Sequence, residues 1–144
     1  MTRPIHARVD LAALRHNLSV ARRCADGARI LAVVKADAYG HGLLRTAPAL
    51  GQADGFALLD LEEAARLRDK GYGHPIILLE GFFSPQEFPA IADLHLIPVI
   101  HEREQLLQLT QDWRHGPVDI YLKLEMIELQ IGKVLTTDSL FISP

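Results

Sequence analysis

A short apolar run returns roughly every twenty residues along this chain, and a segment with helical spacing separates each pair of runs. The runs are His6–Asp10, Arg29–Val34, Gly55–Leu59, Ile76–Leu79, Leu96–Ile100 and Val118–Leu122. Strands that alternate with helices form βαβ units, and such units build parallel sheets. The rhythm therefore predicts an α/β protein with up to six strands in one sheet.

The segments between the runs carry apolar residues at spacings of three and four, which is typical of helices packed against a sheet. Asp10 precedes the first of these segments and is expected to cap it. The run Arg29–Val34 is unbroken and predicts a strand buried on both faces. The predicted helices are Leu11–Ala25, Leu43–Leu50, Leu61–Lys70, Pro85–Ala92 and Glu102–Gln111.

Two sheet architectures suit a series of βα units: an open doubly wound sheet and a closed (β/α)₈ barrel. No Gly-x-Gly-x-x-Gly follows a strand, which weakens the dinucleotide-binding version of the open sheet. A complete barrel takes about 250 residues. In 144 residues the chain would form an incomplete (β/α)₈ TIM-type barrel, with about five βα units plus a sixth strand.

Composition excludes several other classes of protein. The formal net charge is −3 and the basic residues are spread along the chain, so nucleic acid is a poor candidate for a partner. No apolar run is long enough to span a membrane, and the N-terminus lacks the pattern of a signal peptide, so a cytoplasmic protein is expected. Cys24 is the single cysteine, and the scattered histidines form no metal-binding pattern.

The candidate for chemistry is Lys35, which directly follows the run Arg29–Val34. It would lie at the carboxyl end of a strand, where α/β enzymes place their reacting groups. A lysine amine in that position can attach to an aldehyde. From position alone, a lysine that extends into solvent is an equally good interpretation, and Tyr39 and His41 alone resemble ordinary loop residues.

The stretch Val34–Gly42, Val-Lys-Ala-Asp-Ala-Tyr-Gly-His-Gly, resembles the signature of alanine racemases, although Asp37 stands where that family usually has Asn. The likeness continues from about Ala7 to Lys123. It implies a barrel that binds pyridoxal 5'-phosphate, with Lys35 as both the attachment point and the base on the D-alanine face. It also implies that Tyr39 contacts the cofactor phosphate, and that the protein supplies D-alanine for the cell wall as a homodimer.

The resemblance stops soon after Lys123. Counted from there, Gln130 occupies the position of the family's arginine, which helps to bind the carboxylate of the substrate alanine. We therefore divide the chain into a racemase-like partial barrel, residues 1–125, and a divergent tail, residues 126–144. The second base of the family is expected in a later domain, so a chain truncated here should have little or no racemase activity alone.

Two alternatives stay open at this point. One is a racemase fragment without catalytic function, whose open barrel exposes strand edges. The other is a single-domain protein that binds pyridoxal phosphate for cofactor homeostasis. The charged residues Glu62, Glu63, Arg66, Arg68 and Asp69 are interpreted as a solvated helix face with local ion pairs.

Overall fold

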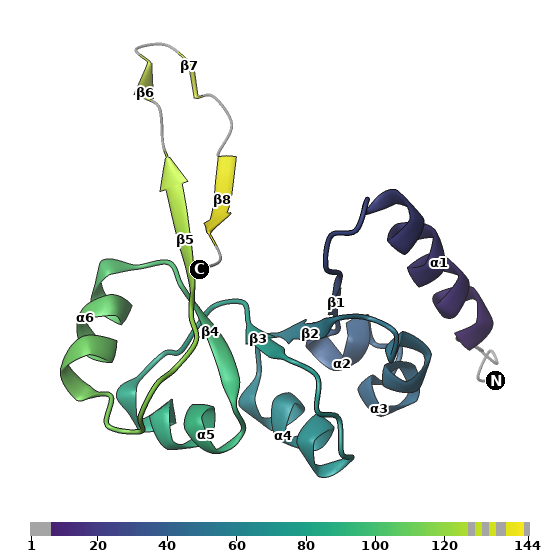
Figure 1. Cartoon of the computed structure of the whole chain (residues 1–144), viewed down its shortest axis with the longest axis horizontal. Helices are drawn as coiled ribbons and strands as arrows, with labels where there is room; N and C mark the ends of the chain where they lie inside the picture. The colour runs from purple at the N-terminus through teal and green to yellow at the C-terminus, as the bar shows by residue number, and fades with distance from the viewer. Residues whose placement is uncertain (1–6, 127–128, 131–132, 135–137, 143–144) are drawn as a thin grey trace, which may run out of the picture.

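The computed structural model describes residues 7–126, 129–130, 133–134 and 138–142. Its main feature is a six-stranded sheet with the strand order β1-β2-β3-β4-β5-β8 (Figure 1). The first five strands run parallel to one another, and β8 is antiparallel to β5. The strands are β1 Leu31–Val33, β2 Gly55–Leu58, β3 Ile76–Leu78, β4 Leu96–Ile100, β5 Tyr121–Met126 and β8 Asp138–Ile142.

Strand order decides between the open doubly wound sheet and the barrel. An open doubly wound sheet reverses its winding, so that consecutive strands lie on either side of the first one. Here β1 to β5 follow each other in chain order without a reversal. This is the order of a (β/α)₈ barrel, and five parallel strands with their helices form a partial one. The predicted fold class is confirmed.

Helices connect the strands close to where the apolar spacing predicts them. They are α1 Leu11–Cys24, α2 Lys35–Tyr39, α3 Leu43–Thr46, α4 Leu61–Asp69, α5 Phe88–Asp93 and α6 Arg103–Asp112, with 3₁₀ turns η1 Ala47–Leu50 and η2 Pro85–Glu87. The helix predicted over Leu43–Leu50 is split into α3 and η1, because Pro48 has no N–H to continue the α-helical bonds. Within the described residues no helix is long and apolar enough to cross a membrane.

Alternate side chains on each strand divide the sheet into a helix-covered face and a barrel-interior face. On the first face, Phe56 and Ile76 pack with Leu67 of α4 and Ile91 of α5 in the main core. On the second face, Ala57, Ile77 and Val99 form a smaller cluster with Tyr121 at its margin. Because side chains alternate along a strand, this division fixes which residues can point towards the barrel interior.

The run Arg29–Val34 does not form a strand buried on both faces, so that prediction is wrong. β1 is the edge of the sheet, and Leu31 and Val33 are 37% and 42% exposed. Val33 is paired with Ala57 of the barrel-interior cluster, and Leu31, two residues earlier on the same face of β1, is paired with Gly55. In a complete barrel a further strand and the opposite wall would cover them.

The first predicted strand, His6–Asp10, is also wrong for its described part, because residues 7–10 adopt neither helix nor strand. Asp10 instead caps α1, and its carboxylate accepts hydrogen bonds from the N–H groups of Ala12 (2.9 Å) and Ala13 (3.1 Å). The local capping preference of aspartate therefore determines the structure of this segment. The parallel sheet consequently has five strands instead of six.

The last parallel strand begins three residues later than predicted, at Tyr121 instead of Val118. Val118 and Ile120 pack against the helix-covered core as an irregular segment. Beyond β5, the short strands β6 Leu129–Gln130 and β7 Lys133–Val134 pair only with each other. They project together with β5 and β8 from the rest of the molecule (Figure 1).

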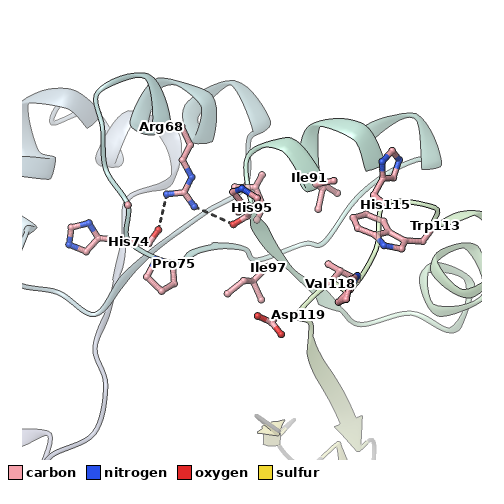
Figure 2. A pocket seen from close by; sticks show the side chains of 14 residues that line it. Arg68, His74, Pro75, Ile91, His95, Ile97, Trp113, His115, Val118 and Asp119 are labelled. Atoms are coloured by element: carbon pink, nitrogen blue, oxygen red, sulfur yellow. Dashed lines mark hydrogen bonds between the residues drawn. The ribbon is translucent and has the colours of Figure 1, made fainter.

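Arg68 of α4 ties together the connections at the amino ends of β3 and β4. Its guanidinium donates to four backbone carbonyls: those of Tyr72 (2.6 Å), His74 (2.8 Å), Leu94 (2.8 Å) and His95 (3.2 Å). Figure 2 shows the guanidinium between His74 and His95. Burial lowers the pKa of Arg68 from its usual value, but a guanidinium remains charged in proteins.

Replacing Arg68 with lysine should destabilise the protein by about 2–4 kcal/mol, because a point-like ammonium cannot satisfy four carbonyls arranged around a planar fork. Urea denaturation of Arg68→Lys and wild type measures this difference. Arg103→Lys, an exposed position at the start of α6, is the matched control and should change stability by less than about 0.5 kcal/mol. Equal effects of the two substitutions would contradict the structural role of Arg68.

Asp54 joins α1 to the beginning of β1. Its Oδ2 accepts from the Ile30 N–H (2.6 Å) and lies 2.7 Å from Nη1 of Arg22. The Ile30 hydrogen bond, followed by the Arg22 hydrogen bond, lowers the pKa of Asp54 from its usual 3.8. A carboxyl whose pKa is depressed on folding stabilises the fold above its unfolded pKa, and this stabilisation disappears as the pH falls through the folded pKa.

Asp54→Asn should therefore lower the melting temperature at neutral pH. The difference from wild type should shrink as the pH falls below about 4, where wild type also becomes protonated. Thermal melts between neutral and acidic pH test this, with Asp69→Asn on the exposed end of α4 as the control. A wild-type-minus-variant difference that stays constant with pH would show that Asp54 does not contribute through its charge.

Candidate functional site

Lys35 follows β1 directly, at the carboxyl end of the sheet. The N–H of Val34 donates to the carbonyl of Ala57 (2.8 Å), so parallel pairing continues up to the residue before the lysine. The Lys35 side chain is half-buried. Within the described residues its amine has neither a hydrogen-bond nor an ion-pair partner, and it is therefore available for chemistry.

The four residues after Lys35 form a left-handed turn. Ala36, Asp37, Ala38 and Tyr39 have φ angles of 53°, 52°, 54° and 54°. Left-handed helical backbone costs roughly 1–2 kcal/mol for each residue with a side chain, and it normally occurs at single positions. Gly40 continues the turn at φ 77°, where it avoids this penalty. A strained segment of this length indicates that the surrounding structure imposes it.

Hydrogen bonds within the segment hold part of this turn. The N–H of Ala38 donates to the carbonyl of Val34 (2.9 Å), and that of Gly42 to the carbonyl of Asp37 (2.9 Å). Oδ1 of Asp37 accepts from the N–H of Leu43 (2.8 Å), which ties the turn to the beginning of α3. These bonds connect both ends of the turn to neighbouring elements.

A carboxylate from α4 holds the middle of the turn. Oε1 of Glu63 accepts from the backbone N–H of Asp37 at 2.5 Å, across 26 residues of sequence. Oε2 of Glu63 is buried without a hydrogen-bond partner among the described residues. Arg66, one helical turn later, lies 3.8 Å from Oδ1 of Asp37. A cavity of about 380 Å³ has Ala36, Glu63 and Arg66 in its lining, so the turn and α4 share one pocket.

The solvated-face interpretation of α4 is therefore wrong for Glu63 and Arg68, which both hydrogen-bond to other elements. One sequence pattern indicates that Glu63 makes a specific hydrogen bond. Asp60-Leu61-Glu62-Glu63 has the spacing of a capping box, in which the last residue would bond back to the first. Asp60 does cap α4, with Oδ1 accepting from the N–H of Glu63 (3.2 Å). The Glu63 carboxylate, however, binds Asp37, and no local pattern could reveal that partner.

Tyr39 and Gln130 are the other residues predicted from the sequence. Tyr39 ends the left-handed turn with its side chain 58% exposed. Within the described residues its hydroxyl makes no hydrogen bond. Gln130 lies in β6, paired with Lys133 in the separate two-stranded sheet. The main sheet therefore brings Lys35 and Tyr39 to one turn, while Gln130 belongs to the projecting hairpin.

A second cavity, of about 400 Å³, lies at the opposite end of the sheet (Figure 2). Its lining comes from the segments that lead into β3, β4 and β5, and it includes Arg68, His95 and Asp119. In barrel enzymes the amino ends of the strands serve stability and the carboxyl ends carry the chemistry. The carboxyl end of the sheet, which carries Lys35 and the pocket that the left-handed turn shares with α4, is therefore the candidate site.

Comparison with known proteins identifies the family of the chain. Residues 9–136 match the family model described as "Alanine racemase, N-terminal domain". This chain belongs to the alanine racemase family. The family resemblance seen in Val34–Gly42 is confirmed, and the matched segment contains Lys35, Tyr39 and Glu63.

Individual relatives give the extent of the likeness. The chain is 57% identical over 124 residues to alanine racemase of Nitrosomonas eutropha, covering 86% of this chain and 34% of that protein. It is 50% identical to the catabolic alanine racemase of Klebsiella aerogenes, with 86% and 35% covered. The crystal structure of biosynthetic alanine racemase from Pseudomonas aeruginosa matches with a TM-score of 0.73 and 42% identity, over 78% of this chain and 32% of that one.

The chain thus spans about a third of the length of the alanine racemases it matches. That third is their N-terminal domain. The family match ends at residue 136, inside the stretch predicted as a divergent tail. The domain division at residue 125 and the roles of Lys35, Tyr39 and Gln130 remain predictions.

The left-handed turn predicts that replacing alanine with glycine changes stability in opposite directions at two exposed positions. Ala36→Gly should stabilise the protein by about 0.5–1 kcal/mol, because relief of left-handed strain exceeds the added entropy of the unfolded chain. Ala21→Gly in the right-handed helix α1 should destabilise it by about the same amount. Denaturant unfolding of both variants measures the two differences. If both glycines are destabilising, the strain at Ala36 is not present in solution.

Proposed function

We propose that this chain is the cofactor-binding part of an alanine racemase and that Lys35 attaches pyridoxal 5'-phosphate through its amine. The observation that carries this proposal is the amine of Lys35, which has no partner among the described residues and lies at the carboxyl end of β1 beside a strained and extensively bonded turn. Strained backbone of this kind is typical of functional sites, and a lysine that served only solubility would not require it.

The residues around Lys35 fit such a cofactor. An amine attaches to an aldehyde most readily when no carboxylate or carbonyl holds it, and Lys35 meets that condition among the described residues. The hydroxyl of Tyr39 can donate a hydrogen bond to a phosphate oxygen. Gly40 has open space around its backbone, since an added Cβ would meet nothing within 4 Å. The backbone there can approach a bound group closely.

When bound, pyridoxal phosphate withdraws electrons from the Cα of an amino acid and so makes its proton removable. The protein must then supply groups that take up and return that proton. In this proposal the Lys35 amine does so on one face of Cα, acting as a general base and then as a general acid. The family likeness supports alanine as the substrate and the D-alanine face as the side on which Lys35 works.

Racemisation requires a second base on the opposite face of Cα. From the family resemblance we expect that base in a later domain, contributed by a partner subunit, and this chain spans about a third of the length of its relatives. Gln130 at the arginine position offers a neutral amide, which cannot make a bidentate charged contact with a carboxylate. We therefore propose that these 144 residues alone bind the cofactor but have little or no racemase activity.

The biological setting follows the family likeness. We propose a cytoplasmic protein whose complete form supplies D-alanine for the cell wall as a homodimer. The half-exposed Leu31 and Val33 on the barrel-interior face are consistent with a domain that is completed by further strands. This role requires no nucleic acid and no membrane partner.

Borohydride trapping tests the attachment. The purified chain is incubated with pyridoxal phosphate, reduced with borohydride and digested, and the modified lysine is located by mass spectrometry. Wild type should carry the label on Lys35, because no other group in the described part of the chain binds its amine. Lys35→Ala should lose essentially all of this label.

Lys70→Ala, which removes an exposed lysine at the end of α4, is the matched control and should leave the label on Lys35 unchanged. Label spread evenly over the surface lysines would contradict the proposal. A D-alanine assay on the same sample tests the second part. Racemisation at the rate of a full-length alanine racemase would show that this chain holds both bases.

A further inference from the structure

The Glu63 carboxylate is unusual because it serves a distant turn instead of its own helix. Glu63 is the third residue of α4, where a capping-box glutamate would bond back to the cap residue. Its Oε1 instead accepts the backbone N–H of Asp37 at 2.5 Å. Its Oε2 is buried and unpartnered within the described residues. Within the described residues, the contact that this side chain makes is therefore its bond to the turn after Lys35.

The position of Asp37 in that turn explains why the bond matters. Asp37 is the second of four consecutive left-handed residues, close to where the turn leaves β1. The first N–H groups of any helical turn lack acceptors in the preceding turn, and this applies to a left-handed one as well. A carboxylate acceptor gives such an N–H a charge-assisted bond, which is shorter and stronger than a bond to a neutral group.

The side chain of Asp37 makes contacts different from those of its backbone N–H. Leu43 N–H donates to Oδ1 of Asp37, and the Arg66 guanidinium lies 3.8 Å from the same oxygen. Both side chains of this ion pair are about half exposed, so the pair contributes little in water. An asparagine at position 37 would keep the oxygen that accepts from Leu43. Glu63 is thus the charged group on which the left-handed backbone depends most directly.

We propose that Glu63 is a positioning residue for Lys35. By holding the N–H of Asp37 it fixes the left-handed turn, and the turn fixes the direction in which the Lys35 side chain leaves the end of β1. Among the described residues no ion pair joins the Glu63 carboxylate to the Lys35 amine, so Glu63 acts through the backbone. This inference rests on the proposed function, in which Lys35 is the attachment point of the cofactor.

Two measurements on the same variants test the inference. Amide hydrogen exchange of Asp37, in protein without cofactor, reports the bond itself. The rate of borohydride-trapped labelling of Lys35 by pyridoxal phosphate reports its consequence. In Glu63→Ala, exchange at Asp37 should become about tenfold faster or more, the effect of losing a hydrogen bond to a charged group. Labelling of Lys35 should slow by about tenfold under conditions in which thermal melts show that the variant is still fully folded.

Three further variants separate positioning from folding and charge. Glu62→Ala removes the exposed carboxylate next to Glu63 and should leave both rates at wild-type values. Asp37→Asn should do the same, since its amide oxygen still accepts from Leu43. Glu63→Gln keeps an acceptor oxygen and should restore much of both rates. If Glu63→Ala does not fold, Glu63→Asp keeps the charge but shortens the reach, and it should reproduce both losses.

The outcomes distinguish this inference from the proposed function. Equal labelling rates in wild type and the Glu63→Ala or Glu63→Asp variant would overturn the positioning role and leave Lys35 as the attachment point. Absence of Lys35 label in wild type would overturn the proposed function. Exchange at Asp37 would still test whether Glu63 holds the turn, and unchanged exchange would overturn the inference independently.

Discussion

The parallel pairing of β1 with β2 is the interaction on which the candidate site depends. It aligns Leu31 with Gly55 and continues to the bond between Val34 and Ala57, which delivers Lys35 to the end of the sheet. The pairing requires glycine at position 55. A Cβ there would lie 2.7 Å from Cδ2 of Leu31 and 2.9 Å from the carbonyl oxygen of Pro75. Any larger residue would push a neighbouring strand away.

The turn after Lys35 has a strained backbone, and a residue distant in the sequence stabilises it. Four left-handed residues after Lys35 are unfavourable by themselves, and their own hydrogen bonds only partly compensate. The remaining support comes from α4, through Glu63. The core beneath α4, with Ala64 and Leu67 fully buried, fixes the position of that helix. Leu67 lies one helical turn after Glu63, so the hydrophobic packing of α4 also fixes the part of the helix from which Glu63 reaches the turn.

The sequence predicts most of the framework because hydrophobic periodicity is a local signal. The strand predicted over Leu96–Ile100 has the same bounds in the structure, and the helix predicted over Leu11–Ala25 ends one residue earlier, at Cys24. The position of Lys35 after a strand follows in the same way. The prediction fails where a local signal competes with a stronger constraint: residues 7–10 adopt a capping conformation, and Leu31 and Val33 lie on an edge.

The detailed site could not be predicted, because its key contact joins residues that are 26 positions apart. Composition and spacing near Glu63 indicate only a helix start. The sequence also does not predict the left-handed turn, because a run of alanine, aspartate and tyrosine does not indicate positive φ angles as glycine does. The family signature marks Lys35 and Tyr39, yet it carries no information on which side chain of α4 supports them.

The separation between Asp37 and Glu63 also sets an order of events during folding. The turn after Lys35 cannot be held until α4 has formed and packed against the sheet, because its acceptor is supplied by that helix. On a chain that emerges from the ribosome, residues 36–39 are therefore synthesised well before they can adopt their final backbone. The lysine that we assign to cofactor attachment is thus synthesised before the helix whose carboxylate holds the neighbouring turn.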